Sequence, residues 1–138
     1  DSAVYVAVDA EGKASPSNTF GLTGGGLGRV LRKFPGAQVI IEAGCQSAWV
    51  ERFCRARGHA VVVANPRRVA LIGHSARKSD AFDAEQLARL GRVDPSLVSP
   101  ISHRSEASQA DLSVIRSRDA LVESRTKLIN HVRGTAKH

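Results

Sequence analysis

A strand–helix–strand pattern in residues 38–64 constrains the fold of this chain more than any other feature. Residues 38–42 and 60–64 are short, mainly apolar runs of the kind that form buried parallel strands. Residues 46–57 between them favour a helix, which Gly58 can close. Parallel strands joined through a helix form a right-handed βαβ unit, so the sequence predicts an α/β fold.

The segment before this unit predicts a hairpin and a helix. Residues 3–8 and 18–22 favour extended structure, and a turn signal at residues 9–12 lies between them. Thr23 can cap a helix with apolar residues at helical spacing, and this helix stops before Pro35.

The segment after the unit is mainly helical. Residues 67–79 are basic and less regular, and helices are expected over residues 80–90 and 105–132, with a proline-containing loop between them. We therefore predict one domain at residues 1–100 and the start of a helical linker at residues 101–138.

The charge of the chain indicates a polyanionic partner. The formal net charge is +7 and the pI is near 10.3, which favours nucleic acid. The longest apolar runs are too short to cross a membrane, so we expect a soluble protein. If Cys45 and Cys54 share one helix, they lie on opposite faces of it, so we predict no disulfide and a cytoplasmic location. The chain contains no Met, and we expect it to be a piece of a longer protein.

Three carboxylates are the candidate catalytic and metal-binding residues. Glu42 ends an apolar strand, at the edge where open α/β sheets place their ligands. Asp80 and Asp83 are three residues apart and would project from one face of a helix. Each has a plainer interpretation, because Glu42 could simply face solvent and Asp80 could be a helix cap with Asp83 in the first turn. The combination with Glu42 and the basic residues just before Asp80 together favour a metal site.

Phosphodiester chemistry explains why these residue types would occur together. Two-metal cleavage needs several hard oxygen ligands that converge on Mg²⁺ or Mn²⁺ ions. Cations near the site would hold the phosphate backbone without reading its sequence. The candidates for that role are Arg67, Arg68, Arg77 and Lys78. The glycine-rich run at residues 24–28 lacks the Lys-Ser/Thr of a phosphate loop.

Several motifs, in order along the chain, resemble those of one family. They are Ile41-Glu42-Ala43-Gly44, then Val61-Val62-Val63-Ala64-Asn65-Pro66, then Lys78-Ser79-Asp80-Ala81-Phe82-Asp83-Ala84, and a tail that includes Leu128-Ile129-Asn130. Together they are similar to the insertion-sequence transposases with an N-terminal DEDD, RuvC-like domain, which use a structured bridge RNA to choose DNA sites. The resemblance covers nearly the whole chain.

The resemblance implies an RNase H-like fold, a mixed sheet that opens with a hairpin and is flanked by helices. It implies that Glu42, Asp80 and Asp83 are three of the four DEDD carboxylates and that they bind Mg²⁺ or Mn²⁺. The first Asp of the family would fall before Asp1, and the family's nucleophilic Ser belongs to a domain beyond His138. A guide RNA is the implied partner besides DNA, the implied location is the bacterial nucleoid, and the piece alone would be inactive.

The last predicted helix would lead into the coiled coil of the family. Its apolar residues recur with a seven-residue period, as pairs at 114–115, 121–122 and 128–129. This period favours a homo-oligomer formed through the helix, while packing of the helix on its own domain is the alternative. Two other functions stay open on the residues: a stand-alone Holliday-junction resolvase, and a non-catalytic basic nucleic-acid-binding module.

Overall fold

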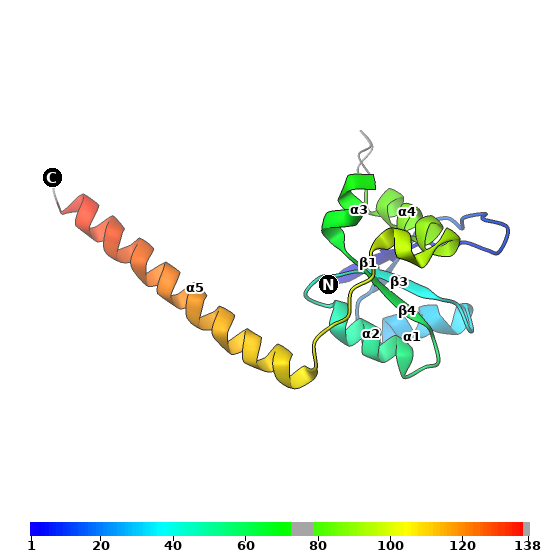
Figure 1. The fold of residues 1–138 in the computed structure, drawn as a ribbon, viewed down its shortest axis with the longest axis horizontal. Coiled ribbons are helices and arrows are strands. Elements are labelled where there is room, and N and C mark those ends of the chain that lie inside the picture. Colours follow the sequence, from blue (N-terminus) through cyan, green and yellow to red (C-terminus); the bar gives the residue numbers. More distant parts are fainter. Residues whose placement is uncertain (73–78, 137–138) are drawn as a thin grey trace. The chain divides into compact units, whose positions relative to one another are not determined.

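The computed structural model describes residues 1–72 and 79–136, and it consists of two compact units. Unit 1 is Asp1–Ser102 and contains the strands of the described residues, whereas the described part of unit 2, His103–His138, is mainly one helix (Figure 1). Unit 1 combines strands with helices, which confirms the predicted α/β class.

The predicted hairpin is present but shorter than expected. Strands β1 (Ser2–Tyr5) and β2 (Asn18–Gly21) pair antiparallel. We predicted a first strand through residue 8, but the ladder ends at Tyr5 and Val8 forms only an isolated bridge. The reason is local, because the backbone N–H of Ala7 donates to the Ser15 hydroxyl at 3.0 Å instead of extending the ladder.

The βαβ prediction is confirmed. Strands β3 (Val39–Glu42) and β4 (Val61–Ala64) pair in parallel, with Glu42 opposite Ala64, and helix α2 (Ser47–Arg55) connects them. The other edge of β4 is also covered. The Val61 carbonyl accepts from Arg55 Nη2 at 3.0 Å, and the Val63 carbonyl accepts from the Ile101 N–H at 2.9 Å. These bonds satisfy an edge that would otherwise be open to another strand.

The two strand pairs remain separate sheets in the described part of the chain. The single mixed sheet that we expected is therefore not continuous. Each strand has only four residues, and β1 uses one edge for β2 while its continuation turns into the loop at residues 9–13. Short strands of this kind leave the second edge of β1 without a ladder.

Helices α1 (Gly24–Lys33) and α2 cover one face of the β3–β4 pair. Thr23 caps α1 as predicted, because its hydroxyl accepts from the Gly26 N–H at 3.1 Å. The buried cluster between helices and strands contains Leu27, Leu31, Val50, Cys54, Val61 and Val63. Most of these side chains are aliphatic, as expected for a chain in which aromatic residues make up only 4%.

Helix α4 (Asp80–Val93) and the short 3-10 helix η1 (Pro95–Val98) lie on the other face (Figure 1). Gly91 allows this contact, because a Cβ there would meet Ile40 Cδ1 at 2.0 Å. Ile40 therefore points toward α4, while its neighbours in β3 pack toward α1 and α2. Val98 is fully buried, and its carbonyl accepts from the Asn65 N–H at 3.0 Å.

The segment after β4 corrects one prediction. We expected residues 67–79 to be less regular, but helix α3 (Pro66–Ile72) begins directly after the strand, and residues 73–78 lie outside the described residues. Asn65 Oδ1 accepts from the Arg67 N–H at 3.1 Å, and Pro66 occupies the first helical position, where a missing N–H costs nothing. Asn65-Pro66 is therefore the start of a helix.

Unit 2 is helix α5 (Glu106–Thr135), which begins after Ser105 and contains no buried residue. Its apolar pairs are exposed, with Val114 at 71% and Leu121 at 72%. The apolar side chains that recur every seven residues are thus exposed along a helix about 45 Å long. Among the described helices, none combines the length and apolar character needed to cross a membrane.

Candidate functional site

Glu42 lies where the sequence predicts it, as the last residue of β3. Its side chain is exposed, whereas the three strand residues before it are partly buried. The parallel ladder continues one step further, since the Ala43 N–H donates to the Ala64 carbonyl at 3.0 Å. A tight turn follows, in which the Ser47 hydroxyl donates to the Gly44 carbonyl at 2.7 Å. Glu42 is therefore held at the carboxyl edge of the strand pair.

Asp80 and Asp83 occupy the first turn of α4, and both are exposed. The cap of this helix is Ser79, whose hydroxyl accepts from the Phe82 N–H at 3.2 Å. The alternative interpretation, in which Asp80 is the cap, is therefore wrong. Both carboxylates still lie near the positive end of the helix dipole, which favours negative charge there. Neither one makes a side-chain hydrogen bond or ion pair within the described residues.

Two arginines that we did not single out from the sequence hold α4 in place. Arg89 Nη1 donates to the Gly12 carbonyl at 2.9 Å, and Arg92 Nη1 donates to the Ala10 carbonyl at 3.0 Å. Both carbonyls belong to the loop between β1 and β2, so the helix with Asp80 and Asp83 is fixed to the hairpin. The only hint in the sequence was the spacing of the two arginines, three residues apart on one helix face.

The three carboxylates are not gathered into one group. Within residues 1–72 and 79–136, no cluster of three or more His, Cys, Asp or Glu side chains could hold a metal ion. The donor chemistry nevertheless fits, because exposed carboxylate oxygens are the ligands that Mg²⁺ and Mn²⁺ prefer. Eleven residues of α4, or about 16 Å, separate Gly91 at the β3 contact from Asp80. The helix contact alone therefore does not bring Asp80 to Glu42.

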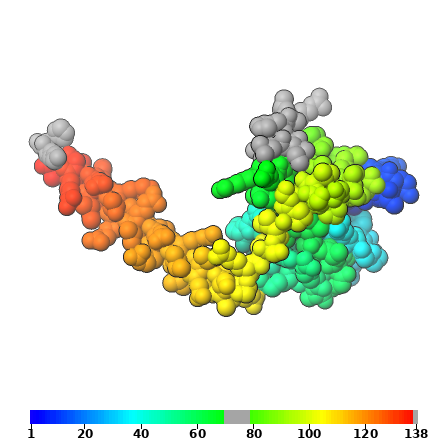
Figure 2. All heavy atoms as spheres, viewed as in Figure 1, coloured from blue at the N-terminus to red at the C-terminus, as the bar shows by residue number. Residues whose placement is uncertain are grey.

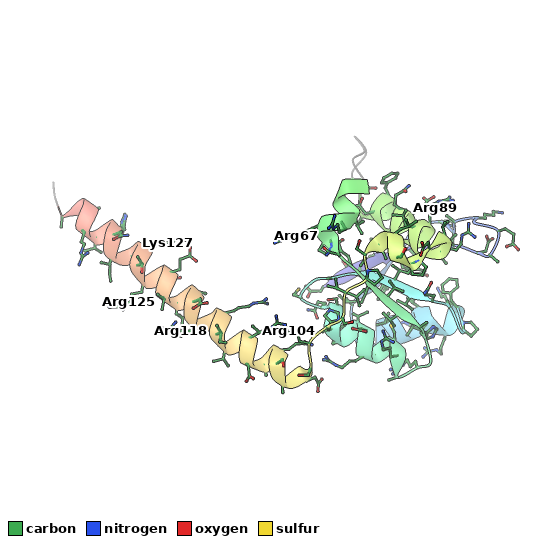
Figure 3. All side chains as sticks on the ribbon, in the orientation of Figure 1. Arg67, Arg89, Arg104, Arg118, Arg125 and Lys127 are labelled. Atoms are coloured by element: carbon green, nitrogen blue, oxygen red, sulfur yellow. The ribbon has the colours of Figure 1, made fainter. Side chains whose placement is uncertain are left out.

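The predicted phosphate-binding cations divide into two groups. Arg67 and Arg68 are exposed in the first turn of α3, and Figure 3 labels Arg67. Arg77 and Lys78 lie outside the described residues. Figure 3 also labels Arg118 and Arg125 on α5, so basic side chains occur on both units.

A comparison with known protein families shows to which family the chain belongs. The profile of the IS110-type DEDD transposases, described as transposase, matches residues 1–137. The chain belongs to this transposase family. Its function is therefore a DNA recombinase function in transposition, and DNA is its partner. Proteins of the family generally use divalent metal ions. No curated protein matches the chain.

Family membership bears on the role of the candidate site residues, but it does not show where a metal ion binds. The acronym DEDD refers to four acidic residues, and the sequence offers Glu42, Asp80 and Asp83 for three of these places. The glycine-rich run at residues 24–28 has a structural explanation instead. A Cβ on Gly26 would meet the Gly21 carbonyl oxygen at 2.0 Å, so the run allows α1 to lie close to the end of β2.

Proposed function

We propose that unit 1 is the RNase H-like, RuvC-type catalytic domain of this transposase, with Glu42, Asp80 and Asp83 as metal ligands. The observation that carries the proposal is the match to a DEDD transposase family over residues 1–137, together with three exposed carboxylates in that order. Their side chains would hold Mg²⁺ or Mn²⁺. Such ions, when bound, activate the attacking oxygen and stabilise the leaving oxygen of a phosphodiester.

The residues of the chain have their own tasks in this proposal. Glu42 is fixed at the strand edge by the β3–β4 ladder, and Asp80 and Asp83 are presented by a helix that Ser79 caps. Arg67, Arg68, Arg77 and Lys78 would hold the DNA backbone or a structured guide RNA beside them. Phosphate contacts of this kind position a nucleic acid and leave the choice of sequence to another component, such as the guide.

Helix α5 would join two or more copies of the chain. Its exposed apolar pairs recur every seven residues, and helices in proteins gain most of their stability from the packing of an apolar face. Burial of these pairs against a second copy would supply that stability. The proposed location is the bacterial nucleoid, where the DNA substrate lies.

Manganese binding tests the proposed site. Titration of the chain with Mn²⁺, followed by electron paramagnetic resonance, should give a weaker affinity for Glu42→Gln and for Asp83→Asn. A direct ligand should cost at least the roughly tenfold that residues behind a ligand cost. Glu11→Gln and Asp111→Asn are the matched controls, because both side chains are exposed and have no partner in the described residues. If all four variants bind Mn²⁺ with unchanged affinity, Asp80 and Asp83 serve only to stabilise the start of the helix through its dipole. That result would favour a non-catalytic module.

A further inference from the structure

The outer surface of α1 and α2 has a charge that the proposed catalytic site does not use. The sequence has no acidic residue from Thr23 to Ile41, and Glu51 is the only one from Ala43 to Ala60. The exposed cations of this surface are Arg29, Arg32, Lys33, Arg52, Arg55 and Arg57. Six cations and one carboxylate give a formal charge of +5. We call this set the α1–α2 basic face.

The two helices form one surface. The Phe53 ring lies against the first turns of α1, within 3.1 Å of the position of a Cβ on Gly24 and 3.8 Å of one on Gly28. The glycines of α1 thus let α2 approach closely. In the space-filling view the two helices form a continuous side of unit 1, drawn in cyan and green (Figure 2). Arg32 of α1 and Arg57, which follows α2, line one hollow, so cations of both segments can contact the same partner.

Three of these six cations make no ion pair within the described residues. Glu51 pairs with Arg55, whose Nε lies 2.9 Å from Glu51 Oε1. The side chains of Arg29, Arg32 and Lys33 make no hydrogen bond or ion pair in the part of the chain that the structure describes. Like charges this close repel, so a surface of this kind gains stability from a polyanion.

Two shallow hollows on either side of α1 show where the charge gathers. Arg29 and Lys33 line the first, beside Asn18 and Thr19 of β2. Arg32 lines the second together with Arg57, Gly28 and Gly36. Their volumes, about 350 and 420 Å³, are at the small end for a ligand pocket, and most of their lining residues are exposed. Such hollows suit successive groups of an extended chain better than one enclosed molecule.

Arg57 is already held in place for an anion. Its guanidinium carbon lies 3.4 Å from the centre of the Phe53 ring, and Nη1 donates to the Phe53 carbonyl at 3.2 Å. A guanidinium that is stacked and hydrogen-bonded in advance loses less freedom when it binds a phosphate. Its remaining N–H groups can donate to phosphate oxygens in the bidentate manner typical of arginine.

We infer that the α1–α2 basic face is a second nucleic-acid-binding surface, which holds a phosphate backbone away from the carboxylates. Asp80 and Asp83 belong to α4, which covers the opposite face of the β3–β4 pair. These two carboxylates therefore lie on the other side of the β3–β4 pair from the α1–α2 basic face. The inference depends on the proposed function only for the class of partner, a nucleic acid.

Binding of two labelled probes in buffer with chelator tests the inference: a short duplex DNA and a hairpin RNA of equal length. The triple variant Arg29→Gln, Arg32→Gln, Lys33→Gln should bind at least one probe on the order of 100-fold more weakly at 0.15 M salt, about 5-fold for each lost contact. The salt dependence should become shallower by about 0.9 for each contact to duplex DNA. Which probe responds tells whether DNA or RNA occupies the surface.

The control removes the same charge elsewhere. The triple variant Lys13→Gln, Arg116→Gln, Arg133→Gln changes three exposed cations that have no partner among the described residues. It should retain affinity within a few-fold of the original chain. Equal losses in both triple variants, or no loss in the first, would overturn the inference. If the first triple variant does not fold, Arg29→Gln and Arg32→Gln singly should each cost about 5-fold.

The chelator in the buffer removes any contribution of bound metal ions to the measured affinity. The carboxylates cannot hold either probe through a metal ion under these conditions, so the measured affinity does not depend on the proposed metal site. Loss of binding in the arginine variants would therefore support the basic face even if Mn²⁺ binding were to show that the carboxylates hold no metal. A chain that binds neither probe would overturn the inference and would point to an acidic protein as the partner.

Discussion

Replacing Gly26 with Ala should destabilise unit 1 although Ala is the better helix former. The added Cβ would lie 2.0 Å from the Gly21 carbonyl oxygen, far inside ordinary contact distance. That oxygen cannot easily move, because it accepts from the Thr23 N–H at 2.8 Å. If α1 moves instead, the bond from the Gly26 N–H to the Thr23 hydroxyl is lost.

The expected change in the free energy of unfolding combines two destabilising contributions and one stabilising contribution. Overpacking costs about 1–3 kcal/mol, loss of the cap costs about 1 kcal/mol, and helix propensity returns about 1 kcal/mol. The net loss is about 1–3 kcal/mol, which lowers the melting temperature by roughly 4–8 °C for each kcal/mol. Trp49 is the only Trp and packs on Phe53, so its fluorescence during urea unfolding reports on unit 1.

The neighbouring glycine is the control. Gly25 is exposed, and a Cβ there would meet nothing within 4 Å. Gly25→Ala should therefore stabilise the unit by about 0.5–1 kcal/mol through helix propensity and reduced freedom of the unfolded chain. A Gly26→Ala variant as stable as Gly25→Ala would contradict this prediction.

The remaining predictions concern the two thiols and one exposed carboxylate. Cys45 is exposed and Cys54 is fully buried, with no disulfide between them, so a thiol reagent should modify one Cys in the folded chain and the second only after unfolding. Burial raises the pKa of the Cys54 thiol, and Arg57 has a smaller opposite effect. The contribution of Cys54 to stability is therefore complete below the thiol's unfolded pKa and declines as the pH rises above it. Cys54→Ser should weaken this loss of stability at alkaline pH, and an unchanged loss would contradict the prediction. Hydrogen bonds from the Ser96 hydroxyl and N–H lower the pKa of Asp94, so its contribution is present above the ordinary value of 3.8 and is lost as the pH falls through the lower folded value. The difference in urea midpoint between the original chain and Asp94→Ala should therefore shrink in acid, and a constant difference would show that this carboxylate has another role.

The elements that the sequence predicted correctly carry their own local signals. Thr23 before a helical run marked the start of α1, and two apolar runs separated by one helix marked β3 and β4. The error at residues 67–72 arose because Asn65-Pro66 can begin a turn or a helix, and only the tertiary context selects between them. Ser79 and Asp80 are both good caps, and their spacing does not show which one accepts the bond.

The pairing of strands and the meeting of side chains depend on contacts between distant segments. The sequence of residues 2–5 does not indicate whether β1 pairs with β3. In the structure, the described residues form two separate sheets. The hydrogen bonds of Arg89 and Arg92 to the hairpin loop join positions 77 and 82 residues apart, which no local pattern specifies. The basic face was visible only as an absence of acidic residues from Thr23 to Ile41. The family resemblance added the roles of the carboxylates, because their spacing alone did not separate metal binding from helix stabilisation.

Carboxylates from β3 and α4 are proposed to serve one metal site, and a double-mutant cycle on Mn²⁺ affinity tests whether they do. Glu42→Gln, Asp83→Asn and the double variant are compared with the original chain in one titration. Residues that bind one site are coupled, so the double variant should lose clearly less affinity than the product of the two single losses. Losses that multiply, or single variants that bind Mn²⁺ as the original chain does, would contradict the account.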